Sequence, residues 1–207
     1  MAGSGRVRGA RPLVIGIGGS GAPGSATERA LVLALGGAER AGADTRLFGG
    51  AFLGGLPLFR PGPAARCAAV CELLDATARA EGVIVASPSY HGGVSAMVKN
   101  ALDHLEDLRE DARPYLDGRA VGCVVTAAGR QTGGTTLVSL RSIVHALRGW
   151  PTPLGVTVRT GPSRPRTGGQ DGAEDGDEER LAVVGRQVAE FAAAFGRARA
   201  AVAGAPR

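Results

Sequence analysis

The stretch GVIVASPSYHGGVSAMVKNALDHL, residues 82–105, changes character twice. It starts with GVIVA, an uninterrupted apolar run of the kind that forms a buried strand. Pro88 then lacks the backbone N–H that a sheet ladder needs, so we expect the strand to cover 82–87 and a loop to follow over 87–94. A chain that breaks a strand so abruptly either makes a turn or holds a ligand at the end of the strand.

Strand-like and helix-like segments alternate along the chain. We expect strands over residues 13–20, 44–50, 82–87, 119–128 and 152–158. Helical spacing and helix end signals predict helices over 25–42, 67–82, 96–108, 135–150 and 179–202. Continuous apolar strands are typical of parallel sheets covered by helices on both faces. The sequence therefore predicts an α/β fold with a five-stranded parallel sheet. We expect this fold to be a single domain over residues 12–202, with a flexible tail over 1–11 and a surface excursion over 160–178.

The composition excludes several function classes. The net charge is +5, but the arginines are scattered and aromatic residues make up only 4%, so we expect no nucleic-acid partner. No apolar stretch reaches the roughly 20 residues of a membrane span, and no secretory signal is recognisable at the start. We therefore expect a cytoplasmic protein without a membrane partner.

Three cysteines, Cys67, Cys71 and Cys123, lack the paired spacing of a metal site, so we expect neither a metal nor a disulfide. Cys67 and Cys71 lie four residues apart on a predicted helix, which would also suit a redox pair. Because free cysteine behaves as a small apolar side chain, we favour three small buried thiols.

Three unusual loops, over 18–27, 87–94 and 127–134, each follow a predicted strand. Ligands of open parallel sheets bind beyond the carboxyl ends of the strands, where these loops would meet. The first loop places Ser20, Ser25 and Thr27 around a helix start, where backbone N–H groups and the helix dipole favour an anion. It has no Walker lysine, so it suits a phosphate that is held and not transferred. An ordinary helix cap is the alternative.

The other two loops suit a flat ligand. Gly92 and Gly93 allow the backbone to approach such a ligand closely. Tyr90 and His91 could flank an aromatic ring or bond its polar edge, although a loop histidine is more often an ordinary surface residue. The third loop, AAGRQTGG, again offers backbone with few side chains over 127–134.

SPSYHGGVSAMVKNALDHL resembles the signature of the NADPH-dependent FMN reductase family, whose fold is the flavodoxin-like three-layer sandwich. GGSGAPGSATERAL resembles the phosphate loop of that family, and the resemblance extends over 13–158. It implies FMN as cofactor, with NAD(P)H as the reductant. The residues implied to hold the phosphate are Ser20, Ser25, Ala26 and Thr27. The residues implied to line the ring are Pro88, Ser89, Tyr90, His91, Gly92, Ala128, Gly129 and Gly133.

Some positions of the chain match the family pattern, and others depart from it. Lys99 and Asp103 fall on its lysine and aspartate, and their i,i+4 spacing predicts an ion pair that stabilises the helix. Ala22 stands where many members have arginine, so the phosphate loop lacks one charge. Ser89 and Ser95 stand where many members have glutamate and proline.

The resemblance implies an FMN-dependent oxidoreductase in which NAD(P)H reduces bound flavin and electrons pass to a flavin, a quinone or a similar small acceptor. The hydride chemistry belongs to the cofactor, so we expect no catalytic side chain beyond Tyr90 and His91 at the ring edge. One alternative is an FMN-dependent dehydrogenase of a small anionic metabolite, such as a chorismate-derived acid, in antibiotic or other natural-product biosynthesis. Another is a non-enzymatic electron carrier, which the net charge of +5 disfavours. The resemblance also implies a homodimer or homotetramer.

Overall fold

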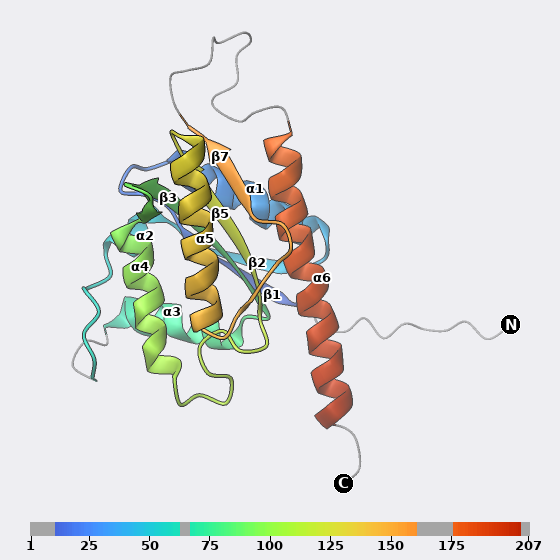
Figure 1. Cartoon of the computed structure of the whole chain (residues 1–207). Coiled ribbons are helices and arrows are strands. Elements are labelled where there is room, and N and C mark those ends of the chain that lie inside the picture. The colour runs from blue at the N-terminus through green and yellow to red at the C-terminus, as the bar shows by residue number, and fades with distance from the viewer. Residues whose placement is uncertain (1–10, 63–66, 161–175, 204–207) are drawn as a thin grey trace, which may run out of the picture.

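A mainly parallel sheet forms the centre of the protein. The computed structural model describes residues 11–62, 67–160 and 176–203. Its strands are β1 (Leu13–Gly18), β2 (Asp44–Phe48), β3 (Gly82–Tyr90), β4 (Gly93–Val94), β5 (Ala120–Ala127), β6 (Trp150–Pro151) and β7 (Val156–Arg159). The order is β2-β1-β3-β5, with β6 and β7 both paired to the outer side of β5, and every pair is parallel except β3 with β4. Since β6 and β7 share the fifth position, the predicted five-stranded parallel sheet is confirmed (Figure 1).

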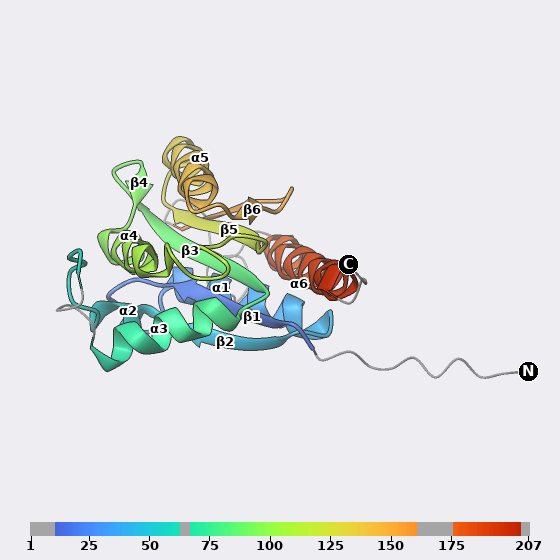
Figure 2. The same ribbon diagram turned by 90° about the horizontal axis from the view of Figure 1, so that it is seen from below.

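Helices cover both faces of this sheet and make three layers (Figure 2). One face carries α1 (Ala26–Arg40) and α6 (Asp177–Ala203). The other carries α2 (Gly50–Gly54), α3 (Ala68–Arg79), α4 (Ala96–Asp103), a 3₁₀ helix (His104–Leu108) and α5 (Arg130–Ala146). No helix in the described part of the chain is long and apolar enough to cross a membrane.

The core explains why the strands are continuous apolar runs. Successive strand residues point to opposite faces, so each strand contributes to both layers of packing. Ile15 and Val83 face the cluster under α3, α4 and α5, whereas Val14 and Ile84 face the cluster under α1 and α6. Because both faces are covered, every residue of β5 is buried.

β3 runs farther than the sequence predicts. It continues through Pro88 to Tyr90, so the expectation that Pro88 ends the strand is wrong. β1 pairs with β3 only as far as Ala86. Beyond that residue β3 has no neighbour on the β1 side, and a missing N–H there costs no ladder hydrogen bond.

The expected loop over 87–94 is a tight hairpin. β3 folds back antiparallel onto β4, with Ser89 opposite Val94. His91 and Gly92 form the two-residue turn with φ of 54° and 81°. Positive φ at both central positions is the requirement of a type I′ turn, which matches the twist of the two strands. The backbone at this strand end is therefore held in one conformation.

Other boundaries also differ from expectation. Residues 130–134, expected in a loop, form the start of α5, and the short helix α2 was not predicted. Of the last predicted strand, over 152–158, only the end is a strand, because β7 begins at Val156, and β6 lies just before the predicted range. Between β6 and β7, Leu154 donates its N–H to Gln187 Oε1, 3.2 Å away. Most of the predicted tail, over 1–11, and of the predicted excursion, over 160–178, lies outside the described residues.

The cysteine prediction is correct for one residue in three. Cys123 is buried in β5, and burial raises the pKa of its thiol to about 12. Cys67 and Cys71 are exposed, so the expectation that they are buried is wrong. The buried face of α3 is formed by Val70 and Leu73, and Cys67 and Cys71 lie outside it.

Candidate active site

The three turns singled out in the sequence lie at one edge of the sheet. β1, β3 and β5 are parallel neighbours, so their carboxyl ends point the same way (Figure 1). Two side-chain contacts join the elements there. Thr27 Oγ1 of α1 lies 2.5 Å from Thr126 Oγ1 of β5, and Ser89 Oγ of β3 lies 2.7 Å from Thr136 Oγ1 of α5. We call this edge, formed by residues 18–27, 87–94 and 127–130, the carboxyl rim.

The first turn presents hydroxyls and backbone at the start of α1. Ser25 is the N-cap residue, and its Oγ accepts a hydrogen bond from the Glu28 N–H at 3.2 Å. A Cβ built on Gly21 or Gly24 would meet nothing within 4 Å, so the front of this turn is open. An open helix N-terminus with a capping hydroxyl has the features of a phosphate site.

Thr27 has a different position from the one expected. Its side chain is only 2% exposed, and its hydroxyl pairs with Thr126. The Thr27 hydroxyl therefore holds α1 against β5 and does not lie at the open front of the turn.

Glu28 joins the first turn to the start of α2. Ser25 and Glu28 have the S-x-x-E spacing of a capping box, in which the glutamate reaches back over the helix start. Here Glu28 Oε2 instead accepts from the Gly50 N–H at 2.9 Å. The two loops touch through their backbones, since a Cβ on Gly50 would lie 2.1 Å from the Ser20 carbonyl oxygen. Sequence reasoning missed this role, although the S-x-x-E spacing marked the residue.

Arg29 brings a cation to the same turn. Its Nη1 donates to the Gly24 carbonyl oxygen, and the side chain is exposed. The turn lacks an arginine at Ala22, and Arg29 places a guanidinium beside it from the first turns of α1. The sequence gave no signal for this contact, because it depends on how the turn folds back over the helix.

The hairpin is fixed at its base and exposed at its tip. Ser87 Oγ accepts from the Ser95 N–H and donates to the Pro88 carbonyl oxygen, both at 2.9 Å, which locks the end of β3 to the start of α4. Tyr90 is 56% exposed, and His91 is exposed beside it. The two side chains considered for the ring edge therefore project from a rigid turn.

The third turn is shorter than expected. Only Ala128 and Gly129 lie between β5 and α5, and both are exposed. Gly133 is buried in α5, where an added Cβ would lie 2.4 Å from Thr157 Cγ2. Its lack of a side chain allows α5 to pack closely on β7, so Gly133 is buried in the helix and is not part of the exposed turn.

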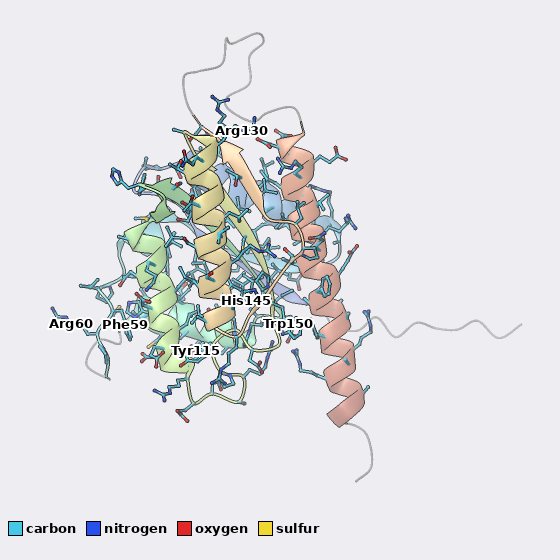
Figure 3. The ribbon with its side chains drawn as sticks, in the orientation of Figure 1. Phe59, Arg60, Tyr115, Arg130, His145 and Trp150 are labelled. Carbon is cyan, nitrogen blue, oxygen red and sulfur yellow. The ribbon has the colours of Figure 1, made fainter. Side chains whose placement is uncertain are left out.

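The motif on α4 has structural roles. The expected ion pair is present, with Lys99 Nζ 2.6 Å from Asp103 Oδ1. Asn100 was not singled out, yet it holds the segment after α2. Its Oδ1 accepts from the Phe59 N–H at 2.8 Å and its Nδ2 donates to the Pro57 carbonyl oxygen at 3.0 Å. Figure 3 shows Phe59 beside α4, well away from Arg130 at the carboxyl rim.

The structure places most of the predicted site residues in the turns of the carboxyl rim. These are Ser20, Ser25, Ala26, Thr27, Pro88, Ser89, Tyr90, His91, Gly92, Ala128 and Gly129. Gly133 is the exception. Within the described residues, no group of three or more His, Cys, Asp or Glu side chains is placed to hold a metal ion.

The sequence model of the family described as NADPH-dependent FMN reductase matches residues 12–162. The chain belongs to this family. It is therefore an FMN-dependent oxidoreductase with NAD(P)H as the reductant. No curated protein sequence matches it significantly.

Several solved structures have the same fold as this protein. An oxidoreductase from Corynebacterium diphtheriae is similar with a TM-score of 0.66 at 16% identity, covering 89% of this chain and 98% of the other. FerB, an NAD(P)H:(acceptor) oxidoreductase from Paracoccus denitrificans, gives 0.64 at 16% identity, covering 89% and 98%. A flavodoxin, WrbA-like protein from Agrobacterium tumefaciens gives 0.62 at 16% identity, covering 89% and 99%. At these identities the likeness establishes the flavodoxin-like fold, as expected.

The carboxyl rim has groups that suit FMN. Open space in front of Gly21 and Gly24, next to the Ser25 cap and the Arg29 guanidinium, suits a phosphate. The backbone of the hairpin and of the third turn suits the polar edge of a flat ring. When bound, FMN supplies the hydride chemistry, and the protein supplies binding and orientation.

Proposed function

We propose that this enzyme passes electrons from NAD(P)H, by way of FMN at the carboxyl rim, to a flavin, a quinone or a similar small acceptor. The observation that carries this proposal is the adjacency of the three turns, because β1, β3 and β5 are neighbours and the Thr27–Thr126 and Ser89–Thr136 pairs join their ends. One phosphate and one flat ring need such an arrangement, with a helix N-terminus beside two backbone-rich turns.

Each turn has its own role in this proposal. Ser20 and Ser25, with the backbone of Ala26, bind the phosphate. Thr27 and Ser89 contribute through their backbone, because their hydroxyls are paired with other side chains. The residues that line the ring are Pro88, Ser89, Tyr90, His91, Gly92, Ala128 and Gly129.

The exposed tip of the hairpin supports the proposal that the electron acceptor is a planar molecule. Tyr90, at 56% exposure, offers an aromatic face next to the proposed ring site. Aromatic rings attract other flat rings in offset or edge-to-face arrangements. A free flavin or a quinone that reaches the carboxyl rim would therefore find a side chain to pack against. The expectations of a cytoplasmic homodimer or homotetramer, with no nucleic-acid partner, stay predictions.

An anaerobic titration tests the proposal. We expect the purified protein to be yellow or to turn yellow on adding FMN, to bleach rapidly with NADPH or NADH, and to regain colour with a quinone or free FMN. Bleaching only with a metabolite extract would favour the dehydrogenase of an anionic metabolite. Slow bleaching with everything except a reductase partner would favour the electron carrier. A colourless protein that takes up no FMN would contradict the proposal.

Arg29 gives a sharper test of the phosphate position. Arg29→Ala is expected to weaken FMN affinity about tenfold, because a hydrogen bond to a charged group contributes about 1.5–3 kcal/mol and tenfold corresponds to about 1.4 kcal/mol. The loss should shrink as salt is raised, since salt screens exposed charges. Fluorescence titration of FMN measures both effects.

Arg40→Ala is the matched control, because Arg40 is exposed in the last turn of the same helix. We expect it to leave FMN affinity within about twofold, the residual effect of one distant screened charge. Equal losses in the two variants would show that Arg29 acts only through net charge, and no loss in either would place the phosphate elsewhere.

A further inference from the structure

Two arginines stand at the end of the carboxyl rim formed by the third turn. Arg130 is the first residue of α5 and follows Gly129 directly. Arg159 ends β7 and pairs with Ala127, the last residue of β5. Both side chains are exposed, and Figure 3 shows Arg130 at the tip of α5.

The two arginines belong to the same face of the sheet. Thr157 of β7 faces α5, since a Cβ on Gly133 of that helix would lie 2.4 Å from Thr157 Cγ2. Alternate residues of a strand share a face, so Arg159 is also on the α5 side. The backbones of the two residues are close as well, because Arg130 comes three residues after Ala127, the partner of Arg159.

Neither guanidinium has a partner among the described residues. In the described part of the chain, Arg130 and Arg159 make no hydrogen bond or ion pair, whereas Arg29, Arg119 and Arg141 are held by backbone carbonyls. The first turn of α5 contains no acidic residue. A cation at a helix N-terminus is electrostatically unfavourable, so Arg130 costs stability at this position.

We propose that Arg130 and Arg159 together bind the 2′-phosphate of NADPH and make the enzyme prefer NADPH to NADH. This rests on the proposed function, which puts the flavin ring against Gly129. Arg130 is the next residue, so its long side chain starts at the edge of the proposed ring site and is free to contact the part of a dinucleotide that lies outside the ring. A phosphate monoester carries nearly two negative charges, and paired guanidinium N–H groups match its oxygens.

The first test compares two double variants with the same net charge. In the FMN-loaded enzyme, Arg130→Ala/Arg159→Ala is expected to lower kcat/KM for NADPH about 30-fold, mainly through KM, with NADH changed less than about threefold. This is the size expected for the loss of two charge-assisted contacts made to substrate and transition state alike. The control is Arg60→Ala/Arg79→Ala, which removes two exposed arginines; Arg60 lies far from Arg130 in Figure 3, and Arg79 ends α3. Equal losses with both nucleotides, or a similar loss in the control, would overturn the proposal.

The second test does not depend on flavin. Calorimetry with 2′,5′-ADP and 5′-AMP as probes is expected to show at least tenfold tighter binding of 2′,5′-ADP to the unmutated protein, and loss of that difference in Arg130→Ala/Arg159→Ala. Equal binding of both probes to the unmutated protein would overturn the proposal even if NADPH bleaches the flavin. A 2′,5′-ADP preference that needs both arginines would support it even if the protein takes up no FMN, the result that defeats the proposed function. Loss of activity only with an anionic acceptor, at unchanged NADPH affinity, would assign the pair to the acceptor and overturn the NADPH proposal.

Discussion

Gly185→Ala is expected to destabilise the protein by about 3 kcal/mol, at the upper end of the usual cost of overpacking a core. Gly185 lies in α6, and a Cβ there would be 1.8 Å from the Ala34 carbonyl oxygen and 2.7 Å from the Ala38 nitrogen of α1. Both are backbone atoms, so no side chain can move aside. Gly37 of α1 faces α6 just as closely, since its Cβ would lie 2.3 Å from the Ala182 carbonyl oxygen.

The two helices would therefore have to separate, and the packing of Leu31, Val184 and Val188 between them and the sheet would loosen. At about 2–4 °C per kcal/mol for a chain of this size, the melting temperature should fall by about 6–12 °C. Thermal unfolding followed by circular dichroism measures this shift.

Gly196→Ala makes the same change in the same helix and should act in the opposite direction. A Cβ on Gly196 would meet nothing within 4 Å. Alanine has the higher helix propensity, so stability is expected to rise by about 0.5–1 kcal/mol. If Gly185→Ala were also neutral or stabilising, α1 and α6 would not pack in backbone contact.

Ser25→Asp is expected to weaken FMN binding at least 100-fold while leaving the protein folded. Aspartate is as good an N-cap as serine, and a negative charge at a helix N-terminus is favourable, so α1 should form normally. The new carboxylate would stand where we place the FMN phosphate. Two like charges 4 Å apart repel by about 4 kcal/mol at an effective dielectric constant of 20, and about 2.7 kcal/mol already corresponds to 100-fold.

Ser25→Asn separates charge from shape. Asparagine has nearly the shape of aspartate and caps helices equally well, but it is neutral. We expect FMN affinity in this variant to stay within about fivefold of the unmutated protein, a change of about 1 kcal/mol. Fluorescence titration of FMN gives the affinities, and circular dichroism confirms folding. An aspartate variant that kept full affinity would show that the phosphate does not bind at the start of α1.

Much of the fold could be predicted from local patterns. The apolar run at 82–86 and the strands around it predict a sheet buried on both faces, and the structure confirms that arrangement. The motif spanning Lys99 and Asp103 predicted both the family and the ion pair on α4. These features depend on residues close together in the chain, which is why the sequence reveals them.

The errors share a different cause. Pro88 stays in β3 because β1 stops pairing two residues earlier, and no local pattern states where a neighbouring strand ends. Gly133 is a helix residue packed closely on Thr157, and no local pattern reveals that contact, because Thr157 is far along the chain. Cys67 and Cys71 are exposed because the buried face of α3 is set by the sheet on which it packs.

The sequence by itself determined the order of the main strands and helices, the family and the three turns in which we propose the site. Only the tertiary structure decided how the groups in and around those turns are used: the Thr27 hydroxyl bonds Thr126, Glu28 reaches Gly50, and the backbones of Arg130 and Arg159 come close at the end of β5. The physical reason is that periodicity and glycine placement are properties of neighbouring residues. Hydrogen bonds and charge pairs instead depend on which distant segments the parallel sheet brings side by side.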